Sequence, residues 1–412
     1  MLPFFYDYNI EVEILSIDPK YTEAPHDKFI IKSIPKNIKI YRIKAFNQKI
    51  TRKVGLGNLG IRAFFQMKKA GNTVIRDFNP DIIFFSTTVF TILPLGRIWK
   101  KKFNIPFIID LQDPWRNDYY LTLPKKQRPK KFWFAHRLNT ILERYTIPYV
   151  SGLVSVNTTY IKVLKKRYRE IENIETLVLP LGATKNDFFL VNNLDVSSSI
   201  KYDSTYINAI YTGVVPDNMK FSIEAIILAV KKYNETSEKK IRLYFIGTNY
   251  APKAKQKLQV MPIAEKHSFC DFVFEFPNRV PYFEAIKTMQ ISDLLLLPGT
   301  FDNSYTASKL YPYILTKKNV LAVFNEKSEL KSIINEISNI PYISFNKNTD
   351  IENLSDLIFE KLIYLLTDFK IIINNSAFEK YTDKAMTKSF INFILKINKE
   401  YRKITKQTNA KS

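Results

Sequence analysis

The sequence has 412 residues, of which 46% are hydrophobic and 25% charged, and this predicts a soluble globular chain with two or three domains. A single cysteine, Cys270, excludes a disulfide framework and any site built from several cysteines. No apolar run approaches the roughly 18 residues of a membrane span, and the first residues lack the pattern of a signal peptide. We therefore expect a cytoplasmic protein.

The formal net charge of +23 is typical of proteins with a polyanionic partner. A compositional bias toward Lys, Asn and Ile, such as an AT-rich coding sequence produces, explains the charge equally well. Among partners, an anionic membrane surface or a phosphorylated substrate ranks ahead of nucleic acid. No recognised nucleic-acid-binding module accompanies the basic residues, so nucleic acid is not expected as a partner.

The first half of the chain alternates between strand-like and helix-like patterns. Short apolar or alternating runs predict strands at residues 12–17, 38–43, 81–86, 106–110 and 152–156. Helical spacing predicts helices at 61–78, 93–103 and 130–145. Strand, helix and strand at this spacing indicate βαβ units and a parallel sheet.

A second series follows a polar stretch at 192–203. It predicts strands at 207–212, 242–246, 272–276, 293–297 and 320–324, helices at 221–233, 282–290 and 308–315, and a largely helical tail at 368–403. We therefore predict an α/β fold with two Rossmann-like, doubly wound domains. The predicted boundaries are 1–190, a linker at 191–204, 205–370, and a helical tail at 371–412. Ligands of such sheets bind at the carboxyl ends of the strands, which places the expected site in a cleft between the domains.

Polar residues follow the strand ends of the first domain. The loop from Asp110 to Arg116 reads Asp-Leu-Gln-Asp-Pro-Trp-Arg, and Asp113 there is able to orient or deprotonate a hydroxyl. Arg116 is able to hold a phosphate bidentately. The alternative is that Asp113 only caps the following turn, with Pro114 at its first helical position. The hydroxyls at 86–88 close the preceding strand, where ordinary helix capping is the competing interpretation.

Glycines and cations mark the strand ends of the second domain. Gly213 and Gly247 end strands where the backbone turns tightly or approaches a ligand, yet neither belongs to a dinucleotide or P-loop motif. Lys220, Arg279 and Lys309 follow strand ends or open helices, which favours a phosphate ligand. Each one alone is more typical of a solvated surface charge, and their recurrence at equivalent strand ends is what favours a site.

A basic and aromatic segment spans residues 125–137. Its cations and rings suit an anionic bilayer surface, and the residues expected to contact it are Lys125, Lys126, Arg128, Lys130, Lys131, Phe132 and Trp133. The alternative is a solvated charge run beside aromatics that face the core. The three histidines, His26, His136 and His267, have no spacing that suggests a metal site.

Seven segments taken in order resemble bacterial "group 1" glycosyltransferases of the GT-B fold. They are Pro-Asp-Ile-Ile-Phe-Phe-Ser at 80–86, Asn-Ile-Pro-Phe-Ile-Ile-Asp-Leu-Gln-Asp-Pro-Trp at 104–115, Gly-Leu-Val-Ser-Val-Asn at 152–157, Tyr-Thr-Gly at 211–213, Leu-Tyr-Phe-Ile-Gly at 243–247, Ser-Asp-Leu-Leu-Leu-Leu-Pro at 292–298 and Ser-Lys-Leu-Tyr-Pro-Tyr-Ile at 308–314. The resemblance covers nearly the whole chain. It implies a last helix that crosses back to the first domain.

The resemblance implies transfer of a sugar from a nucleotide-diphosphate donor to an acceptor hydroxyl, without a metal or other cofactor. The acceptor would be a saccharide or a lipid-linked molecule of cell-surface polysaccharide or glycolipid synthesis, handled by a cytoplasmic enzyme at the inner face of the membrane. The implied donor-binding residues are Gly213, Lys220, Gly247, Arg279, Ser308 and Lys309. The implied catalytic residues are Asp113 and Arg116, and the acceptor side comprises Ser86, Thr87, Thr88, Asp110 and Trp115.

The sequence departs from the family pattern in two places. The first strand and Gly-rich loop that normally precede the strand at 12–17 are absent, which leaves open a chain start placed too late or a degenerate copy. The pair of glutamates expected near Ser304 and Pro312, of which the second would contact the donor ribose, is also absent. A catalytically silent scaffold or binding protein of a polysaccharide assembly complex is therefore the alternative function.

Overall fold

The computed structural model describes residues 1–22, 29–53, 56–116, 118–122, 124–129, 131–198, 200–249, 257–302 and 308–409. The chain forms two compact units. The first contains Met1–Ala24, Ile34–Pro180 and Met386–Ser412, and the second contains Pro25–Ser33 and Leu181–Ala385. The sequence-based boundaries at 190 and 370 stay predictions. In the structure the second unit begins earlier because Phe188 and Val191 are buried in its core.

The first unit is built on parallel strands. Four of them, β3 (Ile83–Ser86), β4 (Phe107–Leu111), β5 (Gly152–Ser155) and β6 (Glu175–Val178), form one sheet in that order. The strands β1 (Glu13–Ile17) and β2 (Lys39–Ile43) pair with each other in a separate two-stranded sheet. We expected one sheet in this unit. Among the described strands none pairs with both β1 and β3, so the unit contains two separate parallel sheets.

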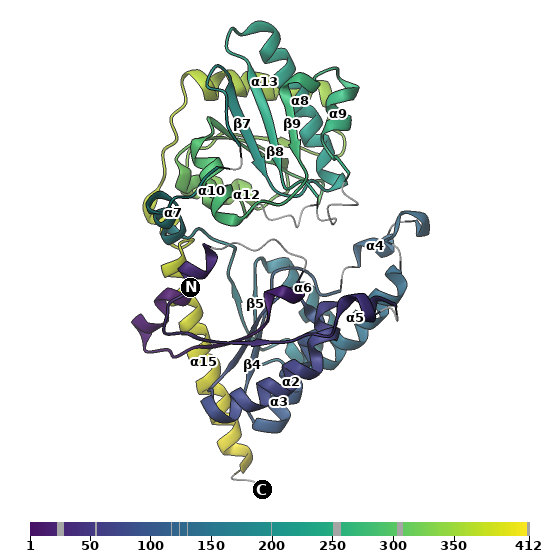
Figure 1. The fold of residues 1–412 in the computed structure, drawn as a ribbon, viewed down its shortest axis with the longest axis vertical. Coiled ribbons are helices and arrows are strands. Elements are labelled where there is room, and N and C mark those ends of the chain that lie inside the picture. The colour runs from purple at the N-terminus through teal and green to yellow at the C-terminus, as the bar shows by residue number, and fades with distance from the viewer. Residues whose placement is uncertain are drawn as a thin grey trace. The chain divides into compact units, whose positions relative to one another are not determined.

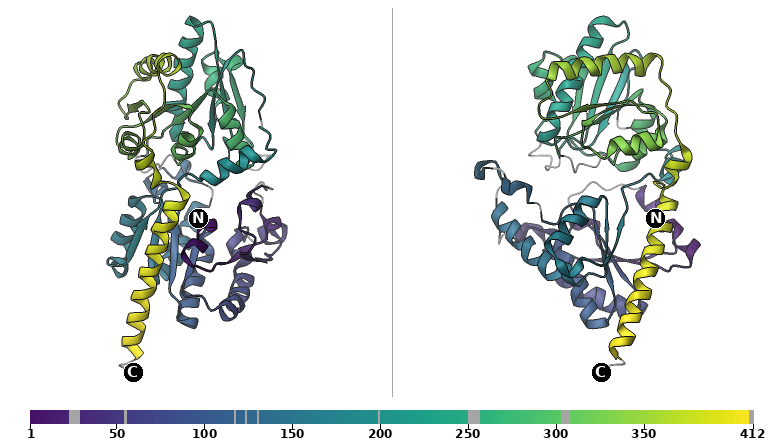
Figure 2. Two further views of the ribbon diagram at one scale, coloured as in Figure 1. Left: turned by 90° about the vertical axis from the view of Figure 1, so that its left-hand side faces the viewer. Right: turned by 180° about the vertical axis from the view of Figure 1, so that it is seen from behind.

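Helices cover both faces of the four-stranded sheet (Figures 1 and 2). The helices of this unit are α1 (Gln48–Lys53), α2 (Leu59–Phe78), α3 (Pro94–Phe103), α4 (Tyr119–Thr122), α5 (Phe132–Thr146), α6 (Thr158–Arg167) and, from Met386 onward, α15 (Asp383–Asn409). On one face, Met67 of α2 and Trp99 of α3 pack with Phe107 of β4. On the other, Phe390 and Ile394 of α15 pack with Ile108 and Val154. The last helix therefore belongs to the first unit, as expected.

The second unit contains one parallel sheet of six strands in the order β12-β11-β10-β7-β8-β9. Its strands are β7 (Ile207–Thr212), β8 (Ile241–Ile246), β9 (Val273–Phe276), β10 (Leu294–Pro298), β11 (Asn319–Asn325) and β12 (Tyr342–Phe345). Its helices are α7 (Lys185–Asn193), α8 (Lys220–Thr236), α9 (Met261–Lys266), α10 (Tyr282–Ile291), α11 (Leu310–Thr316), α12 (Leu330–Ile337), α13 (Ile351–Thr367) and α14 (Asn375–Glu379).

Side chains of this sheet alternate between two apolar layers. Leu294 and Leu296 face α8, α9 and α13, whereas Leu295 and Leu297 face α7, α10, α11 and α12. Strands buried on both faces are continuous apolar runs, which is why the sequence identified them. The predicted strands and helices are confirmed within a few residues. The prediction lacked α1, α4, α6, β6 and α7 in the first half and α9, α12, β12 and α13 in the second.

Candidate functional site

Tight turns shape the carboxyl edge of the second sheet. The neighbouring strands β10, β7, β8 and β9 are parallel, so their carboxyl ends lie along one edge. Gly213 follows β7 with a φ of 144°, and Gly247 follows β8 with a φ of 73°. Both angles lie where a side chain is strained, which explains the two glycines. Their N–H groups donate to Ile246 and Phe276 carbonyls at 2.7 Å each, which binds each turn to the next strand.

The Lys309 side chain lies directly against the first of these turns. A Cβ atom on Gly213 would lie 2.5 Å from Lys309 Cε and 2.7 Å from its Nζ, so only glycine leaves room for this cation. The ammonium lies 4.9 Å from the centre of the Tyr211 ring. Although the side chain keeps some contact with solvent, surrounding protein lowers the pKa of Lys309 to about 8 through burial. In the described ranges no carboxylate pairs with it, so the edge holds a cation without a counter-anion.

The other predicted donor residues are distributed along the same edge. Arg279 lies beside the second turn, since a Cβ atom on Gly247 would lie 3.7 Å from its Cα. Lys220 begins α8, and its ammonium pairs with Asp217 at 2.7 Å. Ser308 precedes Lys309 and is half-buried. The structure thus places Lys309 and Arg279 at the glycine turns, whereas Lys220 forms an ion pair with Asp217. Contacts of these three residues with a donor stay predictions.

The carboxyl edge of the first sheet carries carboxylates instead. Ser86 and Asp110 are paired across β3 and β4, and the Ser86 hydroxyl donates to Asp110 Oδ2 at 3.1 Å. The Gln112 amide donates to the same oxygen at 2.8 Å. Burial raises the pKa of Asp110, and these two hydrogen bonds only partly oppose it. Sequence reasoning did not single out Gln112, although its position two residues after Asp110 is the available signal.

The remaining acceptor-side residues differ in their exposure. Asp113 is an exposed residue, yet nearby protein raises the pKa of its carboxyl by partial burial, and it caps no described helix. The Thr87 hydroxyl accepts from the Val89 N–H at 3.0 Å, which is a turn contact, and Thr88 follows it. Trp115 is only 3% exposed and its ring stacks on Phe90 at 5.8 Å. Contacts of these residues with an acceptor stay predictions.

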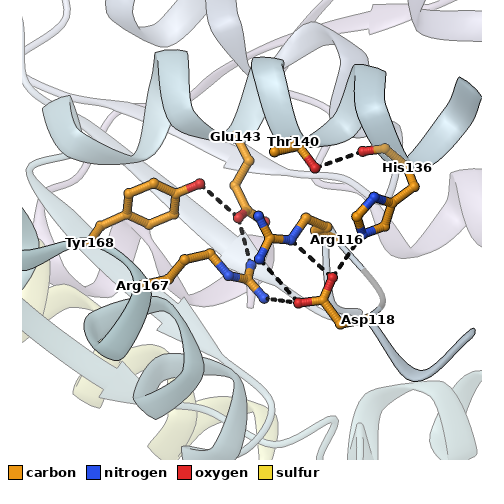
Figure 3. Close-up of polar contacts among 7 residues, drawn as sticks. All are labelled: Arg116, Asp118, His136, Thr140, Glu143, Arg167 and Tyr168. Carbon is orange, nitrogen blue, oxygen red and sulfur yellow. Dashed lines mark hydrogen bonds and ion pairs between the residues drawn. The ribbon is translucent and has the colours of Figure 1, made fainter. Parts of the chain in front are cut away.

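Arg116 takes part in a partly exposed charge network (Figure 3). Its Nε and Nη2 atoms donate to the two oxygens of Asp118 at 3.0 and 3.1 Å. Asp118 also contacts His136 Nε2 at 2.8 Å and Arg167 Nη2 at 3.0 Å. Burial would raise the pKa of Asp118, but hydrogen bonds from His136 and Arg116 and the charges of both arginines lower it overall.

A second carboxylate completes this network. Glu143 of α5 is fully buried, and its Oε1 accepts from Arg167 at 2.6 Å and from the Tyr168 hydroxyl at 2.9 Å. The network joins the loop after β4 to α5 and to the end of α6 (Figure 3). The sequence gives no signal for its long-range contacts, because partners such as Asp118 and Arg167 are 49 residues apart. The bidentate partner of Arg116 is therefore Asp118; a phosphate role for Arg116 stays a prediction.

The basic and aromatic segment is partly exposed. Trp133 is 72% exposed, whereas the Phe132 ring lies 5.2 Å from His136 and 5.6 Å from Tyr120. Arg128 donates to the Leu121 carbonyl at 3.0 Å. Lys125, Lys126 and Lys131 are exposed, and Lys130 lies outside the described residues. The segment thus presents Trp133 and several cations to solvent, and Phe132 to the charge network.

Two features are absent from the described part of the chain. No group of three His, Cys, Asp or Glu residues there is arranged to hold a metal ion. None of the helices described is both long and apolar enough to cross a bilayer.

Comparisons with known proteins identify the architecture. No family model matches the sequence, and no curated protein matches it. Among solved structures, the N-terminal domain of Candida albicans trehalose-6-phosphate phosphatase has a TM-score of 0.55 at 12% identity, covering 94% of this chain and 97% of that one. Sucrose-phosphate synthase of Thermosynechococcus elongatus has a TM-score of 0.53 at 10% identity, with 99% and 91% covered.

A third structure was solved with a nucleotide. Anabaena HepE in complex with UDP has a TM-score of 0.50 at 11% identity, and the match covers 97% of this chain and all of that one, 100%. At such identities the likeness concerns the fold alone. Together with the four-stranded and six-stranded parallel sheets and the C-terminal helix that belongs to the first unit, this likeness identifies the chain as a protein of the GT-B fold, with two Rossmann-like units.

Proposed function

We propose that this chain is a glycosyltransferase that moves a sugar from a nucleotide-diphosphate donor to an acceptor hydroxyl. The observation that carries the proposal is the Lys309 ammonium, which lies beside the Gly213 turn without an acidic partner among the described residues. A buried cation without a counter-ion costs stability, and a diphosphate would supply the missing charge. The fold shared with a UDP-bound protein supports this interpretation.

In the proposed reaction the acceptor oxygen forms a bond to the anomeric carbon while the bond from that carbon to the diphosphate breaks. Lys309 and Arg279 would stabilise the negative charge that develops on the leaving diphosphate. The hydroxyl proton would pass to a carboxylate of the first unit, for which Asp113 and Asp110 are the candidates because burial raises both pKa values. Because side chains would neutralise the diphosphate, we propose that no metal is required. A chelator should leave the transfer rate unchanged.

We further propose that the acceptor belongs to cell-surface polysaccharide or glycolipid synthesis and is presented at a membrane. The exposed Trp133 and the cations at 125–131 support this, since tryptophan and lysine favour the interface of anionic bilayers. The doubly substituted chain Trp133→Ser/Phe134→Ser should bind vesicles of phosphatidylglycerol less well than the unchanged chain. Equal binding by the two chains would contradict this part of the proposal.

The central experiment is thermal unfolding with UDP, GDP, ADP and CMP. A nucleotide at about 100 times its dissociation constant adds about 2.7 kcal/mol to the free energy of unfolding, and the midpoint rises. Lys309→Ala should abolish that rise, whereas Lys327→Ala, at an exposed lysine of the same unit, should retain it. If no nucleotide stabilises the unchanged chain, the scaffold function replaces the transferase.

A further inference from the structure

Three polar side chains form a closed cluster at the carboxyl edge of the four-stranded sheet. Ser86 is the last residue of β3, Asp110 is its partner on β4, and Gln112 follows β4 directly. The Ser86 hydroxyl and the Gln112 amide donate to Asp110 Oδ2 at 3.1 and 2.8 Å, and the same amide nitrogen donates to Ser86 Oγ at 3.3 Å. Each of the three side chains therefore contacts the other two.

The chemistry of the three groups assigns the direction of these hydrogen bonds. An amide nitrogen only donates, so Ser86 Oγ is the acceptor in its contact with Gln112. The hydrogen of the Ser86 hydroxyl is then left for Asp110 Oδ2. Because both hydrogen bonds reach the same carboxylate oxygen from different residues, they fix the rotation of the Asp110 carboxylate.

The other carboxylate oxygen, Asp110 Oδ1, accepts no hydrogen bond from the residues that the structure describes. The residues beside Asp110 on the neighbouring strands are Ser86 of β3 and Val154 of β5, and α15 packs Phe390 on the same face of the sheet. None of these neighbours is charged, and among the described residues no charge contributes to the raised pKa of Asp110. The cluster thus fixes one oxygen and leaves the other without a partner.

The two strands do not need this cluster in order to pair. The backbone ladder already joins β3 to β4, from Ile83 opposite Phe107 to Ser86 opposite Asp110. Ser86 is exposed and Gln112 is only partly buried, so water is available to both side chains as an alternative partner. Hydrogen bonds that compete with water contribute little net stability. The main effect of the cluster is therefore on the orientation of the carboxylate.

The second candidate carboxylate of this edge is not oriented in this way. Asp113 lies three residues after Asp110, and no described group donates a hydrogen bond to its carboxyl, whose pKa is raised by burial alone. A carboxylate without hydrogen bonds samples several rotamers, which reduces the fraction of time spent in the orientation that a proton transfer requires. The geometry therefore favours Asp110 over Asp113.

We propose that Asp110 Oδ1 accepts the proton of the acceptor hydroxyl, and that Ser86 and Gln112 are positioning residues that orient this oxygen. The inference rests on the proposed function and decides between its two candidate carboxylates. As the hydroxyl oxygen bonds to the anomeric carbon, the diphosphate leaves with the electron pair of the broken bond, and the proton moves to Oδ1. Since no described cation contributes at Asp110, the carboxylate suits a neutral hydroxyl better than an anionic acceptor such as phosphate.

Asp110→Asn tests the proton acceptor with the least change of shape. The amide oxygen keeps the hydrogen bonds from Ser86 and Gln112, whereas the NH2 group, a donor, takes the place of Oδ1. The probe is the release of nucleoside diphosphate from UDP-glucose, GDP-mannose and ADP-glucose by the full chain, with octyl glucoside as acceptor. The rate should fall about a hundredfold or more.

Two further aspartates of the first unit complete this comparison. Asp77→Asn, at an exposed aspartate of α2, is the matched control and should retain the rate. Asp113→Asn should lose less of the rate than Asp110→Asn does. The proposal is overturned if Asp113→Asn has the larger loss, or if Asp110→Asn is as active as the control.

Gln112→Met and Ser86→Ala test the positioning role. Each removes a hydrogen bond that lowers the pKa of Asp110, so the acid limb of the pH–rate profile should move to higher pH while the KM for the donor stays the same. Ser86→Thr keeps the hydroxyl and should restore the profile of the unchanged chain. A lower rate with an unmoved profile would mean that the two residues act on stability alone, and the positioning role would be refuted.

The nucleotide experiment separates this inference from the proposed function. Asp110→Asn should show the same midpoint shift with nucleotide as the unchanged chain, because Asp110 belongs to the first unit and Lys309 to the second. If no nucleotide shifts the midpoint of the unchanged chain, the transferase itself fails and the inference fails with it. If a shift occurs but none of the three donors is consumed, NMR titration of the carbon-13-labelled Asp110 carboxyl decides. A pKa that rises in Gln112→Met and in Ser86→Ala supports the inference, and an unchanged pKa overturns it.

Discussion

The carboxyl edges of the four-stranded and the six-stranded sheet carry ionisable groups of opposite sign, and burial disfavours the charged form of both. At the first sheet, burial raises the pKa of Asp110. At the second sheet, burial lowers the pKa of Lys309 to about 8. In each case burial disfavours the charged form of the side chain, and no full counter-charge offsets this effect. Such an arrangement is typical of functional groups. One edge is thereby suited to accept a proton, and the other is suited to accept an anion.

The charge network of the first unit shows the opposite arrangement. Asp118 has three cationic or imidazole partners, and its pKa is lowered rather than raised. Such saturated pairing stabilises a fold and leaves little capacity for a ligand. The comparison thus separates charges that stabilise the structure from charges that are available to bind a substrate. Four predictions test that separation.

The largest effect is expected for Glu143→Ala. The change leaves Arg167 and the Tyr168 hydroxyl without their buried partner, so the free energy of unfolding should fall by about 3–5 kcal/mol. Urea unfolding of this variant beside Glu172→Ala, at an exposed glutamate of the same unit, measures the difference. Equal losses in the two variants would show that the network has no structural role.

The next effect is expected for Gly213→Ala. The new methyl group would meet Lys309 Cε at 2.5 Å on a backbone with a φ of 144°, which should cost about 1–3 kcal/mol and remove the nucleotide shift. In a Lys309→Ala background the steric part disappears and only the backbone strain remains. A double-mutant cycle with a coupling energy near zero would contradict the close approach of the Lys309 side chain to residue 213.

The sequence was informative for this edge but not for the contact itself. Apolar runs ending in glycine located β7 and β8, and Lys309 was singled out because it follows β10. The contact of Gly213 with Lys309 depends on β7 lying next to β10, and strand order is not written in local patterns. The contacts of Asp118 with His136 and Arg167 were missed because they depend on how α5 and α6 pack, which local patterns do not specify either. The helix at 351–367 was missed because exposed Leu357 and Tyr364 blur its apolar period.

An effect of similar size and opposite sign is expected for Lys309→Met. In the folded chain the pKa falls from 10.5 to about 8, so the unfolded chain binds more protons between these values and stability rises with pH across that window. At pH 7 the unchanged chain carries the full penalty, and the substitution should raise the free energy of unfolding by about 1–3 kcal/mol. Urea unfolding at pH 7, with Lys327→Met as control, measures it. A loss of stability would show that Lys309 is a structural residue.

The smallest effect distinguishes the two aspartates of the first unit. Because the pKa of folded Asp110 is raised above 3.8, its ionisation destabilises the fold, and stability falls as pH rises through the interval above 3.8. Asp118 has the lowered pKa, so its contribution is lost as pH falls through the interval below 3.8. Asp110→Asn should therefore stabilise the chain slightly at pH 7, whereas Asp118→Asn should destabilise it. Changes of the same sign in both variants would mean that Asp110, too, is held for structure, and Asp113 would then remain as the candidate proton acceptor of the first edge.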